Sequence, residues 1–139
     1  MKGGIIKKTF CIKGAFYKSH VFPGLNEYIA QLGRHPKAGN RMKQEMMMVA
    51  INAIQTELRG WKTDKPVIIH YEFGEPNKGR KRDVMNVFAF ADKVIEDALV
   101  KVGTITDDNP AYVKNTTHTF VYTPDTYIFV CIEELESTT

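Results

Sequence analysis

Two long amphipathic patterns constrain the fold of this chain more than any other feature. Over residues 41–59, apolar side chains recur at steps of three and four residues, which is typical of a helix with one buried face. Residues 86–102 repeat the pattern, and Gly103 is placed to end that helix. Each helix therefore needs an apolar surface to cover, and the rest of the chain has to supply it.

Short β-type runs supply that surface. Residues in these runs alternate between apolar and polar or are continuously apolar, and Gly or Pro interrupts the chain near several of their ends. The runs occupy residues 5–13, 67–73, 112–122 and 127–134. Residues 123–126 (Thr-Pro-Asp-Thr) have turn chemistry, so we expect the last two runs to form a hairpin.

The chain is long enough for one hydrophobic core. Its 139 residues are 43% hydrophobic and 25% charged, as in ordinary globular domains. Residues 25–29 predict a short helical start, and residues 33–40 predict a basic connector. We therefore expect a single domain over residues 1–139, of the α/β class, with a mixed β-sheet packed against helices.

Bulk properties limit the partners and the compartment. A formal charge of +3 permits an anionic partner but does not demand one. Cys11 and Cys131 lie in apolar alternating runs and are expected to be reduced, buried thiols. No apolar run reaches the ~20 residues that cross a bilayer, and residues 1–4 lead into no signal-peptide core. We expect a cytoplasmic protein that does not associate with membranes.

Unusual charged residues concentrate between residues 78 and 108. A basic cluster is followed by a carboxylate, a helix and an acidic pair: Lys78, Arg80, Lys81, Arg82, then Asp83, then Asp107 and Asp108. Cations can hold a phosphate backbone, and isolated carboxylates can hold the divalent ion that assists chemistry on it. Each feature also has a simpler interpretation, because Asp83 can cap a helix and the acidic pair can form a polar turn.

These residues resemble the RusA family of phage and prophage Holliday-junction resolvases. The family pattern is Arg-Asp-x-Asp-Asn, then a helix with Lys and Asp-x-Leu, then Gly and a terminal Asp-Asp. Its counterparts here are Arg82-Asp83-Val84-Met85-Asn86, Lys93, Asp97-Ala98-Leu99, Gly103 and Asp107-Asp108. Residues 25–29 and the basic lead into residues 41–43 also resemble phage members.

The resemblance implies a homodimer that nicks four-way DNA junctions in recombination, repair or phage DNA processing. The implied cofactor is Mg²⁺, with Mn²⁺ as a substitute, and the compartment would be the host cytoplasm for a phage-encoded protein. The implied catalytic residues are Asp83, Lys93 and Asp108. The implied metal ligands are Asp83, Asp107 and Asp108. The implied DNA contacts are Arg34, Lys37, Lys78, Arg80, Lys81 and Arg82.

Met85 departs from the family pattern, because it stands where the pattern has its second aspartate. A thioether is a poor ligand for Mg²⁺, which prefers oxygen. Three outcomes stay open: another carboxylate substitutes, metal affinity is weakened, or activity is lost. The candidate substitutes are Glu72, Glu75 and Asp92. The alternatives to an active nuclease are a catalytically impaired protein that binds junctions or DNA, and a basic α/β domain unrelated to DNA cleavage.

Spacing gives two geometric expectations. If one ion bridges Asp83 and Asp108, their carboxylates lie within about 5 Å of a common point. Asp83 and Lys93 would be about 15 Å apart in one helix, at 1.5 Å per residue. They converge only if residues 83–86 lie off the helix axis.

Overall fold

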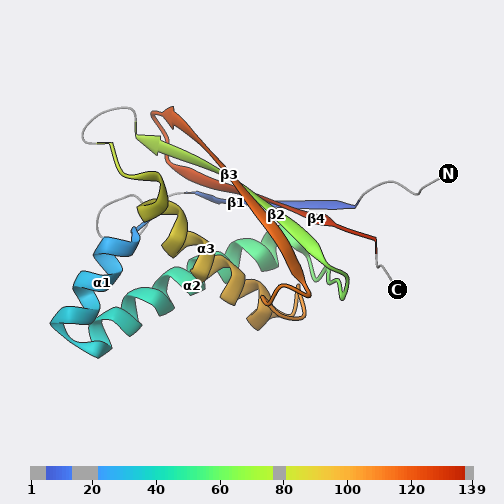
Figure 1. Cartoon of the computed structure of the whole chain (residues 1–139), viewed down its shortest axis with the longest axis horizontal. Coiled ribbons are helices and arrows are strands. Elements are labelled where there is room, and N and C mark those ends of the chain that lie inside the picture. Colours follow the sequence, from blue (N-terminus) through green and yellow to red (C-terminus); the bar gives the residue numbers. More distant parts are fainter. Residues whose placement is uncertain (1–5, 14–21, 77–80, 137–139) are drawn as a thin grey trace.

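The computed structural model describes residues 6–13, 22–76 and 81–136. It is a small α/β domain in which three helices accompany a four-stranded mixed sheet, as the sequence predicts (Figure 1). The elements are β1 (Lys7–Lys13), α1 (Leu25–Arg34), α2 (Pro36–Leu58), β2 (Val67–Pro76), α3 (Val84–Val102), β3 (Val113–Thr123) and β4 (Tyr127–Glu134). None of the helices described is both long and apolar enough to cross a membrane.

The strand order, β1-β4-β2-β3, corrects the expected hairpin. β3 pairs with β2 in parallel, whereas β4 pairs antiparallel with β2 and β1, so β3 and β4 are not neighbours. β2 separates them because its alternate side chains, such as Val67 and Ile69, are fully buried and belong in the middle of the sheet. Residues 124–126 therefore cross two strand spacings, roughly 10 Å, instead of closing a tight hairpin.

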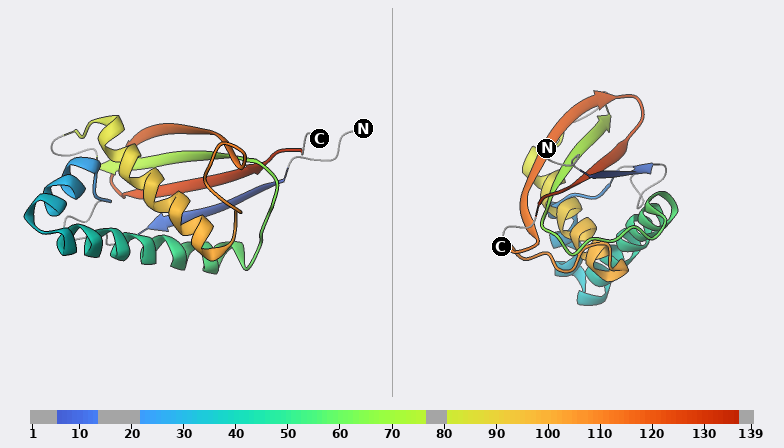
Figure 2. Two further views of the ribbon diagram at one scale, coloured as in Figure 1. Left: turned by 60° about the horizontal axis from the view of Figure 1, so that its bottom comes forward. Right: turned by 90° about the vertical axis from the view of Figure 1, so that its right-hand side faces the viewer.

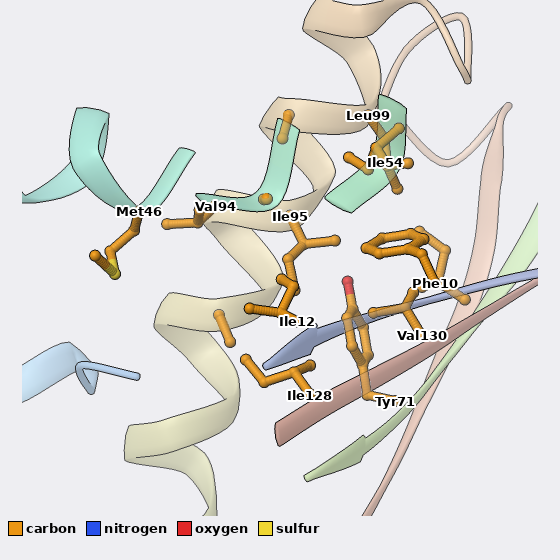
Figure 3. Close-up of a cluster of buried hydrophobic side chains, with 14 of the residues drawn as sticks. Phe10, Ile12, Met46, Ile54, Tyr71, Val94, Ile95, Leu99, Ile128 and Val130 are labelled. Carbon is orange, nitrogen blue, oxygen red and sulfur yellow. The ribbon is translucent and has the colours of Figure 1, made fainter. Parts of the chain in front are cut away.

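Helices α2 and α3 pack against one face of the sheet (Figure 2). Figure 3 shows the core between these layers, where Phe10 and Val130 from the strands meet Ile54 from α2 and Leu99 from α3. The apolar stripes expected on both long helices are buried, and Met46 is a core residue. Apolar periodicity therefore located this core correctly.

Helix continues through most of the segment expected to be a connector. α1 ends at Arg34 and α2 begins at Pro36, so His35 alone separates them. The Nδ1 of His35 accepts a hydrogen bond from the backbone N–H of Lys37 at 3.1 Å. Pro36 occupies the first helical position, where a missing N–H costs little. A Cβ on Gly39 would lie 2.3 Å from the Leu32 side chain, so the tight corner requires glycine.

Helix α3 begins two residues earlier than expected. It runs from Val84 to Val102, and Asp83 is its N-cap. Gly103 ends it with a φ of 89°, and its N–H bonds back to the carbonyls of Leu99 and Val100, which confirms the predicted C-cap. The early start aligns residues 84–93 on one helix axis, and this decides the geometry of the candidate site.

Candidate functional site

Arg82 anchors the start of α3 to the rest of the domain. Its Nε and one terminal nitrogen donate to the two carboxylate oxygens of Glu75, at 2.9 and 2.8 Å. Its other terminal nitrogen donates to the carbonyl of Phe22 at 2.7 Å. The Arg82 side chain is only 18% exposed. The guanidinium is thus occupied within the chain, which gives Arg82 a structural role, and its expected DNA contact stays a prediction.

Asn86 performs a second structural task at the same place. Its Oδ1 accepts a hydrogen bond from the backbone N–H of Asn26 at 2.7 Å, which satisfies a free donor at the start of α1. Gly24 makes this approach possible, since a Cβ there would lie 2.4 Å from the Asn86 amide nitrogen. Two residues of the RusA-like pattern, Arg82 and Asn86, therefore hold β2, α1 and α3 together.

Asp83 is exposed, and its side chain makes no capping hydrogen bond. The interpretation of Asp83 as a helix cap is thus confirmed for its position at the N-cap. The expected hydrogen bond from a backbone N–H to its carboxylate is absent. Lys81 lies nearby over the ring of Tyr122, with its Nζ 4.1 Å from the ring centroid. Met85 is 55% exposed, so its thioether faces solvent instead of filling the core.

The three carboxylates considered as substitutes for the missing aspartate all have partners of their own. Glu72 accepts a hydrogen bond from the hydroxyl of Tyr127 at 2.6 Å. Glu75 binds Arg82. Asp92 accepts a hydrogen bond from the buried hydroxyl of Tyr71 at 2.8 Å.

Asp83 and Asp108 lie beyond opposite ends of α3. This helix has 19 residues and is about 28 Å long at 1.5 Å per residue. Asp83 precedes its first residue, whereas Asp108 follows its last and interacts electrostatically with Asp97 and Asp107. Within one chain, these two aspartates do not share a metal ion, contrary to the bridging geometry expected from the sequence.

Lys93 does not converge with Asp83 either. Both residues lie along the axis of α3, ten positions apart, which corresponds to about 15 Å. The Nζ of Lys93 lies 3.6 Å from Asp97 instead, as the four-residue spacing predicts. Asp97 also pairs with Lys43 of α2, at 2.8 Å.

Negative charge gathers along the C-terminal two thirds of α3 and the turn after it. We call Asp92, Glu96, Asp97, Asp107 and Asp108 the acidic group. Burial, the hydrogen bond with Asp92 and the charges of Asp92, Asp108 and Asp97 raise the pKa of Glu96 from 4.5 to about 9. Burial, followed by the hydrogen bond with Asp107 and the charge of Asp97, raises the pKa of Asp108. Glu96 therefore holds a proton at neutral pH.

Sequence reasoning missed Glu96 and Tyr71. Burial, then the charges of Asp92 and Glu96, raise the pKa of the Tyr71 hydroxyl well above its ordinary value. Glu96 follows Asp92 by four residues, so the two share a helix face, and that spacing is the signal that could have found the pair. The contribution of Tyr71 depends on packing between β2 and α3, which spacing does not reveal.

The basic residues expected to contact DNA belong to other segments. Arg34 ends α1 and Lys37 lies in the first turn of α2, while Lys81 precedes α3. The corner between α1 and α2 and the start of α3 lie at one end of the domain, and the loop after α3 lies at the opposite end (Figures 1 and 2). Arg34 donates to Gln31 at 3.3 Å. Lys78 and Arg80, also expected to contact DNA, lie outside the described residues.

The metal ligands implied by the resemblance do not fit one ion within one chain. Carboxylate oxygens suit Mg²⁺ chemically. However, α3 separates Asp83 from Asp107 and Asp108, and no three Asp, Glu, His or Cys side chains among the residues described are grouped to hold a metal. Comparison with protein-family models and with curated proteins found no match for this chain.

Proposed function

We propose that this protein is a structure-selective endonuclease that acts on four-way DNA junctions in recombination, repair or phage DNA processing. The observation that carries the proposal is the acidic group on α3, where neighbouring carboxylates and burial keep Glu96 protonated. Strongly perturbed carboxylates are typical of catalytic and ion-binding sites. The RusA-like pattern over residues 82–108 supports the same function, and Mg²⁺ enters the proposal from that resemblance.

We assign the described residues three roles: binding DNA phosphates, positioning the start of α3 and donating a proton. Lys81, Arg34 and Lys37 bind flanking phosphates without reading bases, which suits an enzyme selective for DNA shape. Arg82 positions the start of α3 through Glu75. Glu96 carries a proton at neutral pH and can deliver it to a leaving oxygen as a general acid.

Cleavage of a labelled synthetic four-way junction tests the proposal. Asp83→Asn and Asp108→Asn should each abolish nicking, as the RusA-like pattern implies for both carboxylates, although within one chain they lie beyond opposite ends of α3. Glu45→Gln provides the control, since it removes an exposed carboxylate on α2, outside the acidic group. Cleavage that survives both aspartate substitutions would rule out the assigned residues. A protein that neither binds nor nicks junctions would refute the function.

A second candidate is a junction-binding accessory protein without catalysis. It is favoured by exposed Met85, which leaves the start of α3 without the second carboxylate of the family pattern. This candidate predicts salt-sensitive junction binding without nicking. It also predicts that Met85→Asp raises the affinity for Mg²⁺, measured by calorimetric titration. Unchanged metal affinity in that variant would count against it.

A further inference from the structure

Aromatic side chains form a row on one face of β3. His118, Phe120 and Tyr122 occupy alternate positions, so all three point to the same face of the sheet. The ring centroid of His118 lies 4.5 Å from that of Phe88, which places this face toward α3. Phe120 stacks on Phe73 of β2, with ring centroids 4.7 Å apart and an interplanar angle of 15°. Packed neighbours therefore hold two of the three rings in place.

Tyr122 ends the row and is open to solvent. It is 52% exposed, and the Nζ of Lys81 lies 4.1 Å from its ring centroid. Because Phe88 contacts His118, and Lys81 immediately before α3 contacts Tyr122, the start of α3 lies beside the C-terminal end of β3. Val84 precedes Phe88 by about one helical turn, shares its face and is 41% exposed. Its side chain adds apolar surface beside the row.

The charges around the row limit what can cover it. Residues 115–123 contain no Asp, Glu, Lys or Arg, and Lys81 supplies a cation over the last ring. Unpaired nucleobases have flat faces that stack on aromatic rings, and the phosphates between them are attracted to cations. A duplex hides those faces within its own base stack. Exposed Asp83 offsets part of the positive charge, so stacking on the rings has to supply most of the affinity.

We propose that these side chains form a platform for unpaired bases of a DNA strand at the branch point of the junction. We call the following residues the aromatic platform: Lys81, His118, Phe120 and Tyr122. His118 and Tyr122 are four residues apart on β3, about 13 Å, so the two exposed rings can take different bases. Every base has a face that can stack, so the platform selects unpaired structure instead of sequence.

The aromatic platform leads toward the acidic group along α3. Asp92 and Glu96 follow Phe88 at four-residue steps, so all three share one helix face. Phe88 contacts His118 of the platform, and Asp92 lies about 6 Å farther along the axis of α3, at 1.5 Å per residue. A strand held on the platform would thus run beside the acidic group. This step rests on the proposed function, whereas the binding of unpaired bases does not.

Binding of a fluorescein-labelled, single-stranded oligothymidylate tests the platform without cleavage, by fluorescence anisotropy in EDTA. Tyr122→Ala should weaken binding about 5- to 150-fold, the equivalent of the roughly 1–3 kcal/mol that one stacked base contributes. Tyr122→Phe, which keeps the ring, should recover most of that loss. Val121→Ala provides the matched control, because Val121 is exposed on the opposite face of β3.

Three results of this titration would overturn the proposal. Wild-type protein that binds no single strand has no platform for unpaired bases. Equal binding by wild type and Tyr122→Ala would place the bases elsewhere. Equal weakening in Tyr122→Phe and Tyr122→Ala would assign the interaction to the tyrosine hydroxyl instead of to stacking.

Photocrosslinking of the wild-type protein covers the case in which a Tyr122 variant fails to fold. An oligothymidylate that carries 5-iodouracil crosslinks to aromatic side chains that its bases contact. Peptide mapping should find the crosslink within residues 118–122. A crosslink confined to other segments would also overturn the proposal.

A pair of four-way junctions separates this proposal from the proposed function. Wild-type protein should bind a junction with unpaired thymines at its branch point more tightly than a fully paired one, and Tyr122→Ala should remove the difference. Equal wild-type affinity for both junctions would refute a platform that acts at the branch point. Nicking of junctions by a protein that binds no single strand would refute the platform alone. Single-strand binding without nicking of either junction would instead refute the proposed function and leave the platform standing.

Discussion

Replacing Glu96 with glutamine should stabilise the protein near neutral pH and have little effect near pH 4. The folded state raises the pKa of Glu96 from 4.5 to about 9. Between these values the folded protein binds more protons than the unfolded chain, so stability falls as the pH rises through that window. The glutamine side chain of the variant cannot ionise and therefore escapes this penalty.

The size of the effect follows from the shift. A solution at pH 7 is 2.5 units above the ordinary pKa of 4.5. At 1.36 kcal/mol per unit, keeping Glu96 protonated in the folded state at this pH lowers the free energy of unfolding by about 3 kcal/mol. Glu96 is only half-buried, and water screens its interactions with neighbouring carboxylates, so we expect a gain of roughly 1–2 kcal/mol. For a chain of this length, that gain raises the melting temperature by about 3–8 °C.

Thermal unfolding followed by circular dichroism at pH 4, 7 and 8.5 provides the assay. The difference between Glu96→Gln and wild type should be near zero at pH 4 and should grow toward pH 8.5. Glu45→Gln, which removes an exposed carboxylate, should show no such trend. A variant that is equally stable or less stable than wild type at every pH would refute the assigned protonation of Glu96.

Three further predictions concern the start of α3. Arg82→Ala should lower the free energy of unfolding by about 2–4 kcal/mol in urea denaturation, because it leaves Glu75 largely buried without its partner. A large loss of junction affinity at unchanged stability would instead make Arg82 a phosphate contact. Asn86→Ala should cost about 1 kcal/mol by the same measurement, as expected for loss of the cap on α1, and a neutral result would contradict that role. Lys81→Ala should weaken junction binding and reduce the slope of log K against log salt by about 1, whereas an unchanged slope would remove Lys81 from the DNA-binding surface.

Local sequence patterns predicted the features that depend on a single helix or strand. The apolar stripes of α2 and α3 appear in the sequence because helical periodicity and burial coincide there. Gly103 could be assigned in advance because only a residue tolerant of positive φ ends a helix in that conformation. The α/β class followed from the need to cover two amphipathic helices with strands.

Features that depend on distant partners escaped prediction. The turn chemistry at residues 123–126 is genuine, but β2, which occurs earlier in the chain, lies between the strands that this turn connects. Arg82 and Asn86 find their partners 60 residues away, at Phe22 and Asn26, so spacing alone could not distinguish a structural role from a functional one. The pKa of Glu96 depends on burial that only the packed domain creates.

The most direct test of the central claim is incubation of the wild-type protein with a labelled four-way junction, with Mg²⁺ or with EDTA. The account predicts paired nicks at symmetric positions on opposing strands with Mg²⁺ and none with EDTA. Intact junctions under both conditions, in a protein shown to be folded, would contradict the claim that this chain is a junction-cleaving nuclease.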